Sequence, residues 1–208
     1  KGLSNTLGVG HKCAMRMKIE GAGQSPTTTK FLFPTLLHIR EEFLTETSLD
    51  NLSKLAEDKA YVESESLNRA VIEFALGALR QQGADLTNFS AIELSEIWFN
   101  VLEAGEHHWD HTHANHILSG ILYLTEDCFT IFGDPRPAAA VLPLSYKEPS
   151  EGQVRSYVHK GMRNSAVLFP SWLPHRVATT ASRRKTIAFN LMLRGRFGGD
   201  HSREQIVL

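Results

Sequence analysis

Residues 106–124 read EHHWDHTHANHILSGILYL and join a cluster of histidines to a strongly apolar segment. Five of the ten histidines in the chain fall in this stretch, at positions 107, 108, 111, 113 and 116. Residues 117–124 are mostly large and apolar, which is typical of a buried strand. The stretch therefore predicts a strand with several imidazoles at its mouth.

Short runs of the same kind continue toward the C-terminal end of the chain. They alternate in polarity or are rich in β-branched and aromatic residues, and Gly, Pro, Asp and Asn separate them. The runs are Ile97–Leu102, Ile117–Leu124, Phe129–Phe132, Val154–His159, Ala166–Phe169, Arg176–Thr179 and Thr186–Leu193. A parallel α/β fold would need helices between them. We therefore expect a mainly β fold with N-terminal helices, a double-stranded β-helix (jelly roll, cupin-like).

Two helices are predicted before these strands. Leu49, Leu52 and Leu55 recur at helical spacing after Ser48, which is a favourable N-cap. A second helix is predicted from Ser66 as its N-cap to Gly83 as its stop signal. Its apolar face would consist of Leu67, Val71, Phe74 and Ala78.

The domain organisation follows from these segments. Residues 1–29 are rich in Gly, Ser, Thr and Lys without clear periodicity, so we expect a poorly structured arm. Residues 30–95 would hold an N-terminal strand and the supporting helices. Residues 96–208 would form the double-stranded β-helix catalytic core, with one structural domain overall.

Charge and composition exclude several classes of protein. The formal net charge is −1 with both signs interspersed, so no nucleic-acid partner is expected. No apolar run approaches the roughly 20 residues that span a bilayer, so we expect no membrane partner. The chain has two cysteines, Cys13 and Cys128, in no redox or metal-binding spacing. Together with the lack of a secretory signal pattern at the start, they favour a reducing compartment, and we expect a cytoplasmic location.

The histidine cluster favours a metal site. Side chains alternate between the two faces of an extended chain, so His111 and His113 would project together, while His108 and Asp110 would share the opposite face. Clustering of a rare residue type is what metal binding demands and core packing does not. His175 follows a strand that ends in a turn and is the candidate third ligand.

Arg184 lies nine residues beyond His175 and opens another predicted strand. A basic residue one strand away from a metal-binding histidine can pair bidentately with a carboxylate-bearing co-substrate. Along this strand Arg184, Thr186, Ala188 and Asn190 would point together, and this small, polar face suits the lining of a cavity.

The ordered motifs resemble those of the iron(II) and 2-oxoglutarate-dependent oxygenases, and especially an uncharacterised subfamily related to prolyl hydroxylases. The resemblance covers roughly residues 98 to 194. It rests on His111-Thr112-His113, Ser119-Gly120-Ile121-Leu122-Tyr123, Asp134-Pro135-Arg136, Phe169 to His175, Arg184 and Phe189-Asn190.

The resemblance implies that His111 and His175 bind iron. It also implies that Arg184 and Tyr123 bind the distal carboxylate of 2-oxoglutarate, and Asn190 completes the predicted co-substrate-binding residues. The wider superfamily has a carboxylate where this chain has His113.

The identity of the third metal ligand is therefore left open. Either three imidazoles bind the metal, as in some cupins, or a carboxylate comes from elsewhere. His108 with Asp110 would satisfy the usual His-x-Asp pattern, and Asp134 is a further candidate. The His-x-His pattern of the subfamily favours His111 and His113.

The resemblance implies the cofactors Fe(II), 2-oxoglutarate as co-substrate, and dioxygen. The predicted activity is a hydroxylase reaction that couples decarboxylation of 2-oxoglutarate to succinate with oxidation of an unactivated C–H bond. The alternatives are a cupin-like metalloenzyme and a metal-binding jelly-roll module that does not use 2-oxoglutarate. Arg184 and Tyr123 favour the first interpretation, because the others need no carboxylate anchor. We expect a small-molecule or peptidyl substrate, and a homodimer is left open.

Overall fold

The computed structural model describes residues 34–57, 62, 64–136, 145, 147, 154–198 and 206–208. The predicted arm at residues 1–29 lies outside this part of the chain. The helices are α1 (Glu46–Glu57) and α2 (Glu65–Gln81). The strands are β1 (His38–Arg40), β2 (Phe89–Leu102), β3 (His108–His111), β4 (Leu118–Tyr123), β5 (Cys128–Gly133), β6 (Ser156–Gly161), β7 (Ala166–Pro170), β8 (His175–Val177), β9 (Arg184–Phe197) and β10 (Ile206–Val207).

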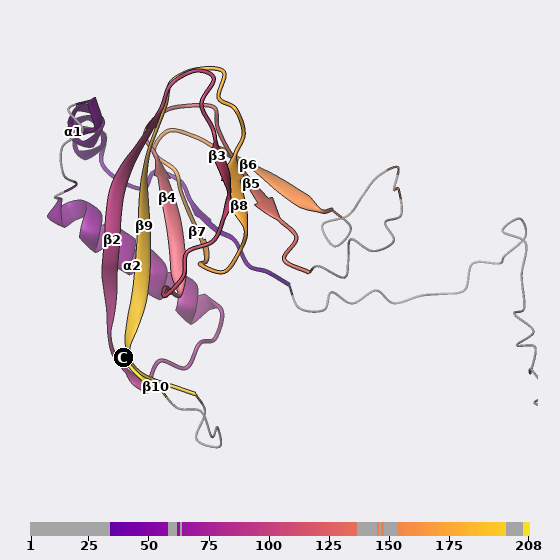
Figure 1. Ribbon diagram of the computed structural model, residues 1–208. Coiled ribbons are helices and arrows are strands. Elements are labelled where there is room, and N and C mark those ends of the chain that lie inside the picture. The colour runs from indigo at the N-terminus through magenta and orange to yellow at the C-terminus, as the bar shows by residue number, and fades with distance from the viewer. Residues whose placement is uncertain are drawn as a thin grey trace, which may run out of the picture. The chain divides into compact units, whose positions relative to one another are not determined.

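The strands form two antiparallel sheets (Figure 1). The larger has the order β1-β7-β4-β9-β10, with β2 also paired to β9, and the smaller has the order β3-β8-β5-β6. From β2 to β5 the chain alternates between the sheets, and it does so again from β6 to β9. This is the arrangement of a double-stranded β-helix, so the predicted fold class is confirmed.

The helices cover one face of the larger sheet, and Figure 1 shows α2 crossing behind β2, β9 and β4. Their buried residues form one core with the odd-numbered side chains of β9, which are Ile187, Phe189, Leu191 and Leu193. The even-numbered residues Arg184, Thr186 and Ala188 line a cavity between the sheets instead. The predicted division of this strand into two faces is confirmed, and it directs Arg184 away from the helices.

Both helices begin before the predicted N-caps. The backbone N–H of Ser48 donates to Oγ1 of Thr45 at 3.3 Å, and α1 starts at Glu46. Ser64 rather than Ser66 caps α2. In each case an acidic residue occupies the first turn, where the helix dipole favours it. The predicted end of α2 is confirmed, since Gly83 follows the C-cap with φ of +72°.

Strand β2 also begins earlier than predicted, at Phe89 rather than near Ile97. Its first half is mostly exposed or half-buried, so its apolar pattern is weak there. The boundary at residue 96 between the supporting segment and the catalytic core stays a prediction. No helix in the described part of the chain is both long and apolar enough to cross a membrane.

Strand β4 is buried along its whole length between β7 and β9. Gly120 at its centre has no room for a side chain. A Cβ there would overlap the ring of Phe189 and lie 2.8 Å from the carbonyl oxygen of Val167. Gly161 on β6 likewise leaves space for the ring of Tyr123. Gly120 thus makes room for Phe189 in the core under the helices, and Gly161 makes room for Tyr123 in the second core cluster.

Candidate active site

Three histidines converge at one end of the cavity between the sheets. His111 on β3 and His175 on β8 are direct cross-strand partners. His113 follows β3 and is held by a hydrogen bond from its backbone N–H to the carbonyl oxygen of Ser171, at 2.9 Å. One ring nitrogen from each histidine lies within 4.8 Å of those of the other two. The structure thus brings together the three residues that the sequence predicts as metal ligands.

Backbone carbonyls orient two of the three rings. Nδ1 of His175 lies 3.0 Å from the carbonyl oxygen of Leu173, and Nδ1 of His111 lies 2.7 Å from that of Trp109. Because a carbonyl oxygen only accepts, each Nδ1 carries the proton and each Nε2 offers a lone pair. This arrangement of the distal nitrogen is the usual one in metal-binding histidines. The two rings are therefore fixed in the tautomer that binds a cation.

Burial favours the uncharged form of His175 and His113. The pKa of His175 is lowered to about 4, chiefly by burial; the neighbouring His111 and His113 act in the same direction, and the hydrogen bond to Leu173 acts in the opposite direction. Burial also lowers the pKa of His113. Neutral imidazole is the form that binds metal, so the site is ready for a cation at neutral pH.

Among the described residues, neither Asp110 nor Asp134, the two carboxylates considered as alternative ligands, belongs to the converging group. Asp110 is exposed, and both its oxygens lie 3.3 Å from Nη1 of Arg176. Asp134 accepts two hydrogen bonds from the side chain of Arg136, at 2.8 and 2.9 Å. The predicted opposite orientation of His108 was wrong: it lines the same cavity as the three converging histidines. The reason is an irregular register between His108 and His111, which breaks the simple alternation of faces.

Arg184 lies in the same cavity and is only 3% exposed. Its Nη1 donates to Oγ1 of Thr186 at 3.1 Å, and its Nη2 donates to Oγ1 of Thr130 at 3.5 Å. Nε has no hydrogen-bond partner, and no carboxylate pairs with this guanidinium among the described residues. Burial lowers its pKa. A buried cation without a counter-ion is costly, so the cavity is suited to an anionic ligand.

Tyr123 and Thr130 complete the surroundings of Arg184. The Tyr123 hydroxyl lies 2.9 Å from Oγ1 of Thr130, and the guanidinium carbon lies 5.9 Å from the centre of the Tyr123 ring. Burial raises the pKa of the Tyr123 phenol, so it stays protonated and able to donate. The charge of Arg184 also contributes, after burial, to lowering the pKa of His108. This electrostatic coupling links the Arg184 end of the cavity to its histidine-lined wall.

The basic neighbours of Arg184 are placed quite differently. Arg183 pairs with Glu57 at 2.6 Å and with Glu103 at 2.9 Å. Lys185 pairs with Glu57 at 2.8 Å. Arg183 and Lys185 are thus paired with carboxylates outside the cavity, so Arg184 alone of this basic triplet lines it.

The cavity is narrow. Its volume is about 30 Å³. The wall opposite the histidines includes Trp98 and Asn100 of β2, which the sequence analysis did not single out. Thr130 was also missed, although a buried polar residue at an inward position of β5 was a usable signal.

Two other predicted residues have distinct surroundings. The amide of Asn190 contacts Ser119, Glu96 and His113, and its predicted role in co-substrate binding stays a prediction. Trp172 is 56% exposed and follows Ser171 directly, next to the backbone contact that holds His113.

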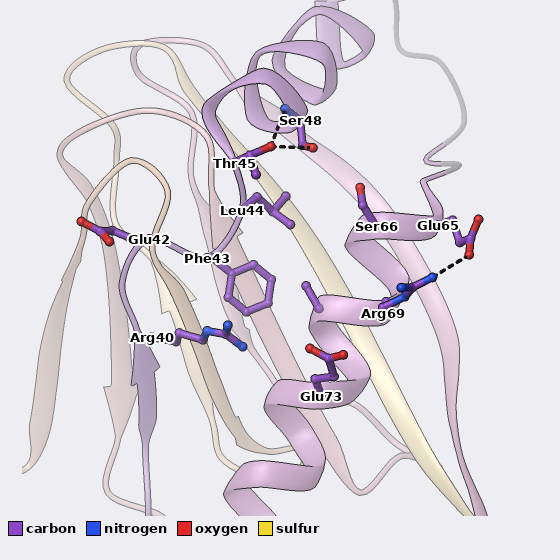
Figure 2. Close-up of a pocket in the computed structure, with 11 residues that line it drawn as sticks. Arg40, Glu42, Phe43, Leu44, Thr45, Ser48, Glu65, Ser66, Arg69 and Glu73 are labelled. Carbon is purple, nitrogen blue, oxygen red and sulfur yellow. Dashed lines mark hydrogen bonds and ion pairs between the residues drawn. The ribbon is translucent and has the colours of Figure 1, made fainter.

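A larger hollow of about 630 Å³ lies where the segment between β1 and α1 meets the first turns of α2 (Figure 2). Arg40, Arg69 and Glu73 are among the side chains around it, and Arg69 is paired with Glu65 at 2.9 Å. Its lining contains no histidine or cysteine, and its charges are mixed. Among the described residues, the group of histidines that could hold a metal ion lies in the narrower cavity between the sheets.

Comparison with known proteins identifies the kind of site. A family model described as a putative 2OG-Fe(II) oxygenase matches residues 96–190. The chain is similar to the 2-oxoglutarate-Fe(II) oxygenases. This match confirms the resemblance predicted from the sequence, and with it the prediction of an oxygenase that uses Fe(II), 2-oxoglutarate and dioxygen. The matched segment contains His111, His113, His175 and Arg184. The chain matches none of the curated proteins.

Solved structures of 2-oxoglutarate-Fe(II) oxygenases share the fold. A prolyl-4-hydroxylase from Pseudomonas putida has a TM-score of 0.54 and 14% identity over 77% of this chain and 89% of the other. The α-ketoglutarate-dependent epimerase of nogalamycin biosynthesis has a TM-score of 0.53 and 12% identity over 81% and 83%. A viral collagen prolyl hydroxylase from Paramecium bursaria Chlorella virus-1 has a TM-score of 0.50 and 10% identity over 82% and 96%.

Proposed function

We propose that the protein is an Fe(II)- and 2-oxoglutarate-dependent hydroxylase in which His111, His113 and His175 bind the metal. The observation that carries this proposal is the presence, in one cavity, of converging imidazoles and a buried arginine without an acidic partner among the described residues. The first group suits a divalent cation, and the second suits a carboxylate. Fe(II) with 2-oxoglutarate and dioxygen supplies the oxidising power for attack on a C–H bond.

The co-substrate would lie between the two ends of the cavity. Its distal carboxylate would receive hydrogen bonds from Arg184, whose Nε is free to donate, and from the hydroxyl group of Tyr123 or Thr130. Its 2-oxo acid end would then face the histidines.

The substrate class is a small molecule or a peptide. The structurally similar proteins include prolyl hydroxylases and an epimerase, which supports both possibilities. Trp109 is 79% exposed and Trp172 is 56% exposed, and each lies close in sequence to a proposed metal ligand. Exposed indole rings suit a substrate with an apolar ring or an aliphatic surface.

The cupin-like alternative shares the three-imidazole metal site but has no need of a carboxylate anchor. The burial of Arg184 favours the oxygenase, because a cationic side chain at 3% exposure is unfavourable unless an anion joins it.

Succinate release tests this proposal. The protein is incubated with Fe(II), 2-oxoglutarate and air, alone and with proline-containing peptides, free amino acids and other small molecules, and His175→Ala serves as the control. We expect succinate formation that requires Fe(II), increases with the correct substrate class and is absent in the variant. Metal-dependent oxidation of a substrate without any consumption of 2-oxoglutarate would contradict the proposal and favour the cupin-like enzyme.

A further inference from the structure

Asn190 lies on β9 and is almost fully buried beside His113. Its Oδ1 accepts a hydrogen bond from Oγ of Ser119 at 2.7 Å. Its Nδ2 lies 2.7 Å from Oε2 of Glu96 and 3.4 Å from Nδ1 of His113. A carboxylate only accepts, so the contact with Glu96 establishes that the nitrogen of the amide faces Glu96 and His113.

A β-bulge brings Glu96 to this position. The register of β2 on β9 shifts between Leu94 and Glu96, and after the shift Glu96 is the direct partner of Asn190. Ser95, the extra residue, donates from Oγ to the backbone oxygen of Asn190 at 3.1 Å. Bulges of this kind re-aim a side chain and are frequent beside active sites. The bulge therefore directs a carboxylate toward an amide that touches a proposed metal ligand.

His113 differs from the other two histidines in the group that contacts its Nδ1 atom. Nδ1 of His111 and of His175 each face a backbone carbonyl oxygen, which is a fixed acceptor. Nδ1 of His113 faces the Asn190 amide, which has both a donor and an acceptor end. In the structure the donor end faces it, so the proton of the neutral ring belongs on Nε2.

The remaining contact of His113 agrees with that assignment. Its Nε2 lies 3.3 Å from Nε2 of His175. Because Nδ1 of His175 already carries the proton that binds Leu173, Nε2 of His175 is an acceptor. In the structure, Nε2–H of His113 thus donates to Nε2 of His175, and a metal ion bound by these two nitrogens would take the place of that hydrogen bond.

We propose that Asn190 is the positioning residue for His113 and that its amide turns over when metal binds. With metal on Nε2 of His113, the ring proton sits on Nδ1, having moved there through solvent, and needs an acceptor. After the turn the amide presents Oδ1 to this Nδ1–H, and Nδ2 donates to Oγ of Ser119. Glu96 then loses its amide partner, which its half-exposed side chain and the nearby His116 allow. This inference rests on the proposed metal site.

Metal affinity in three variants tests the inference. Asn190→Leu keeps the volume and removes the acceptor, and we expect Zn(II) or Co(II) affinity to fall by about 10- to 100-fold, the usual effect of losing such a partner. Asn190→Asp supplies an acceptor without any turn, and we expect affinity equal to or above that of the wild type. Ser95→Ala is the matched control, because its hydroxyl touches only the backbone of Asn190, and its affinity should not change.

Histidine NMR gives a readout that a merely structural role would not move. In the Zn(II)-loaded wild type, ¹⁵N-labelled histidine should show three Nδ1–H protons protected from solvent exchange, and Asn190→Leu should lose the protection of one of them while Asn190→Asp keeps it. Thermal unfolding of the metal-free variants checks that each folds.

The outcomes separate this inference from the proposed function. If Asn190→Leu binds metal as tightly as the wild type and keeps all three protected protons, the positioning role is wrong while the metal site stands. Equal losses in Asn190→Leu and Asn190→Asp would show that Asn190 acts by packing alone, which also overturns the inference. If the wild type binds neither metal, the proposed metal site fails together with it.

Discussion

The two ends of the cavity between the sheets satisfy their polar groups in opposite ways. At the end with the proposed metal ligands the three imidazoles have partners within the chain, and His111 is exposed to solvent. At the other end Arg184 is buried and its Nε lacks a partner in the described residues. Neutral rings are cheap to bury when hydrogen-bonded, whereas a buried charge needs a counter-charge. One end is therefore assembled by the fold, and the other is completed by a ligand.

Among the substitutions considered, removal of His175 should have the largest effect, and the affected property is metal binding at the histidine end of the cavity. We expect His175→Ala to lose stoichiometric Fe(II), because two ligands that lie close together on one segment remain and the cross-strand partner is gone. Metal content after anaerobic loading and gel filtration measures the effect. His108→Ala is the control, since His108 lines the cavity outside the converging trio. Full metal content in His175→Ala, or its loss in His108→Ala, would show that the ligands are misassigned.

Acid should destabilise the metal-free protein through its buried histidines. The pKa of His175 is about 4 in the fold against an ordinary value of 6.5, so the unfolded chain binds more protons between these limits. The contribution of His175 is complete above pH 6.5 and is lost as the pH falls to about 4, and it amounts to roughly 3 kcal/mol. Urea unfolding across this range measures it.

The matched variant for this prediction is His175→Gln, which cannot take up a proton. The pH dependence of its unfolding free energy should be weaker than that of the wild type, although His108, His113 and His159, whose pKa values burial also lowers, still contribute. Identical slopes in the two proteins would mean that His175 is not buried as described.

Substitution of Arg184 should affect the other end of the cavity alone. A charge-assisted hydrogen bond contributes roughly 1.5 to 3 kcal/mol, so Arg184→Ala should weaken 2-oxoglutarate binding by about tenfold to somewhat above a hundredfold. Calorimetric titration of 2-oxoglutarate into Mn(II)-loaded protein measures this without turnover. Arg183→Ala and Lys185→Ala, whose charges pair at the surface, should differ little from the wild type. Equal losses in all three variants would point to a general effect of positive charge instead.

Substitution of Asp110 should have the smallest effect on metal affinity and on stability. Its exposed pair with Arg176 is of a kind that contributes about 0 to 1 kcal/mol. We expect Asp110→Asn to bind Fe(II) with unchanged affinity and to unfold within about 0.5 kcal/mol of the wild type. Loss of iron in Asp110→Asn would establish the His-x-Asp alternative, with Asp110 as the carboxylate ligand.

The sequence was sufficient for the fold and for much of the site. Alternation along β9 correctly grouped Arg184, Thr186 and Ala188 on a cavity-lining face, and the structure shows that the opposite face, with Phe189, is buried in the core. The spacing of His111 and His113 likewise predicted two rings that converge with His175. Where strands are regular, a period of two residues is a reliable guide.

The predictions failed where strands are irregular. His108 shares the cavity with His111 because of a register shift in β3, and Glu96 reaches Asn190 through a bulge in β2. Neither irregularity has a marker in the sequence, since no glycine or proline occupies the two positions. That Arg184 has no counter-ion among the described residues could not be foreseen either, because it depends on which segments pack around the guanidinium in three dimensions.

Anaerobic titration of 2-oxoglutarate into the Fe(II)-loaded wild-type protein tests the central claim most directly. Chelation of Fe(II) by the 2-oxo acid gives a metal-to-ligand charge-transfer band in the visible range. We predict that this band appears and saturates at one 2-oxoglutarate per iron. A protein that retains its iron but shows no such band at any 2-oxoglutarate concentration would contradict the account.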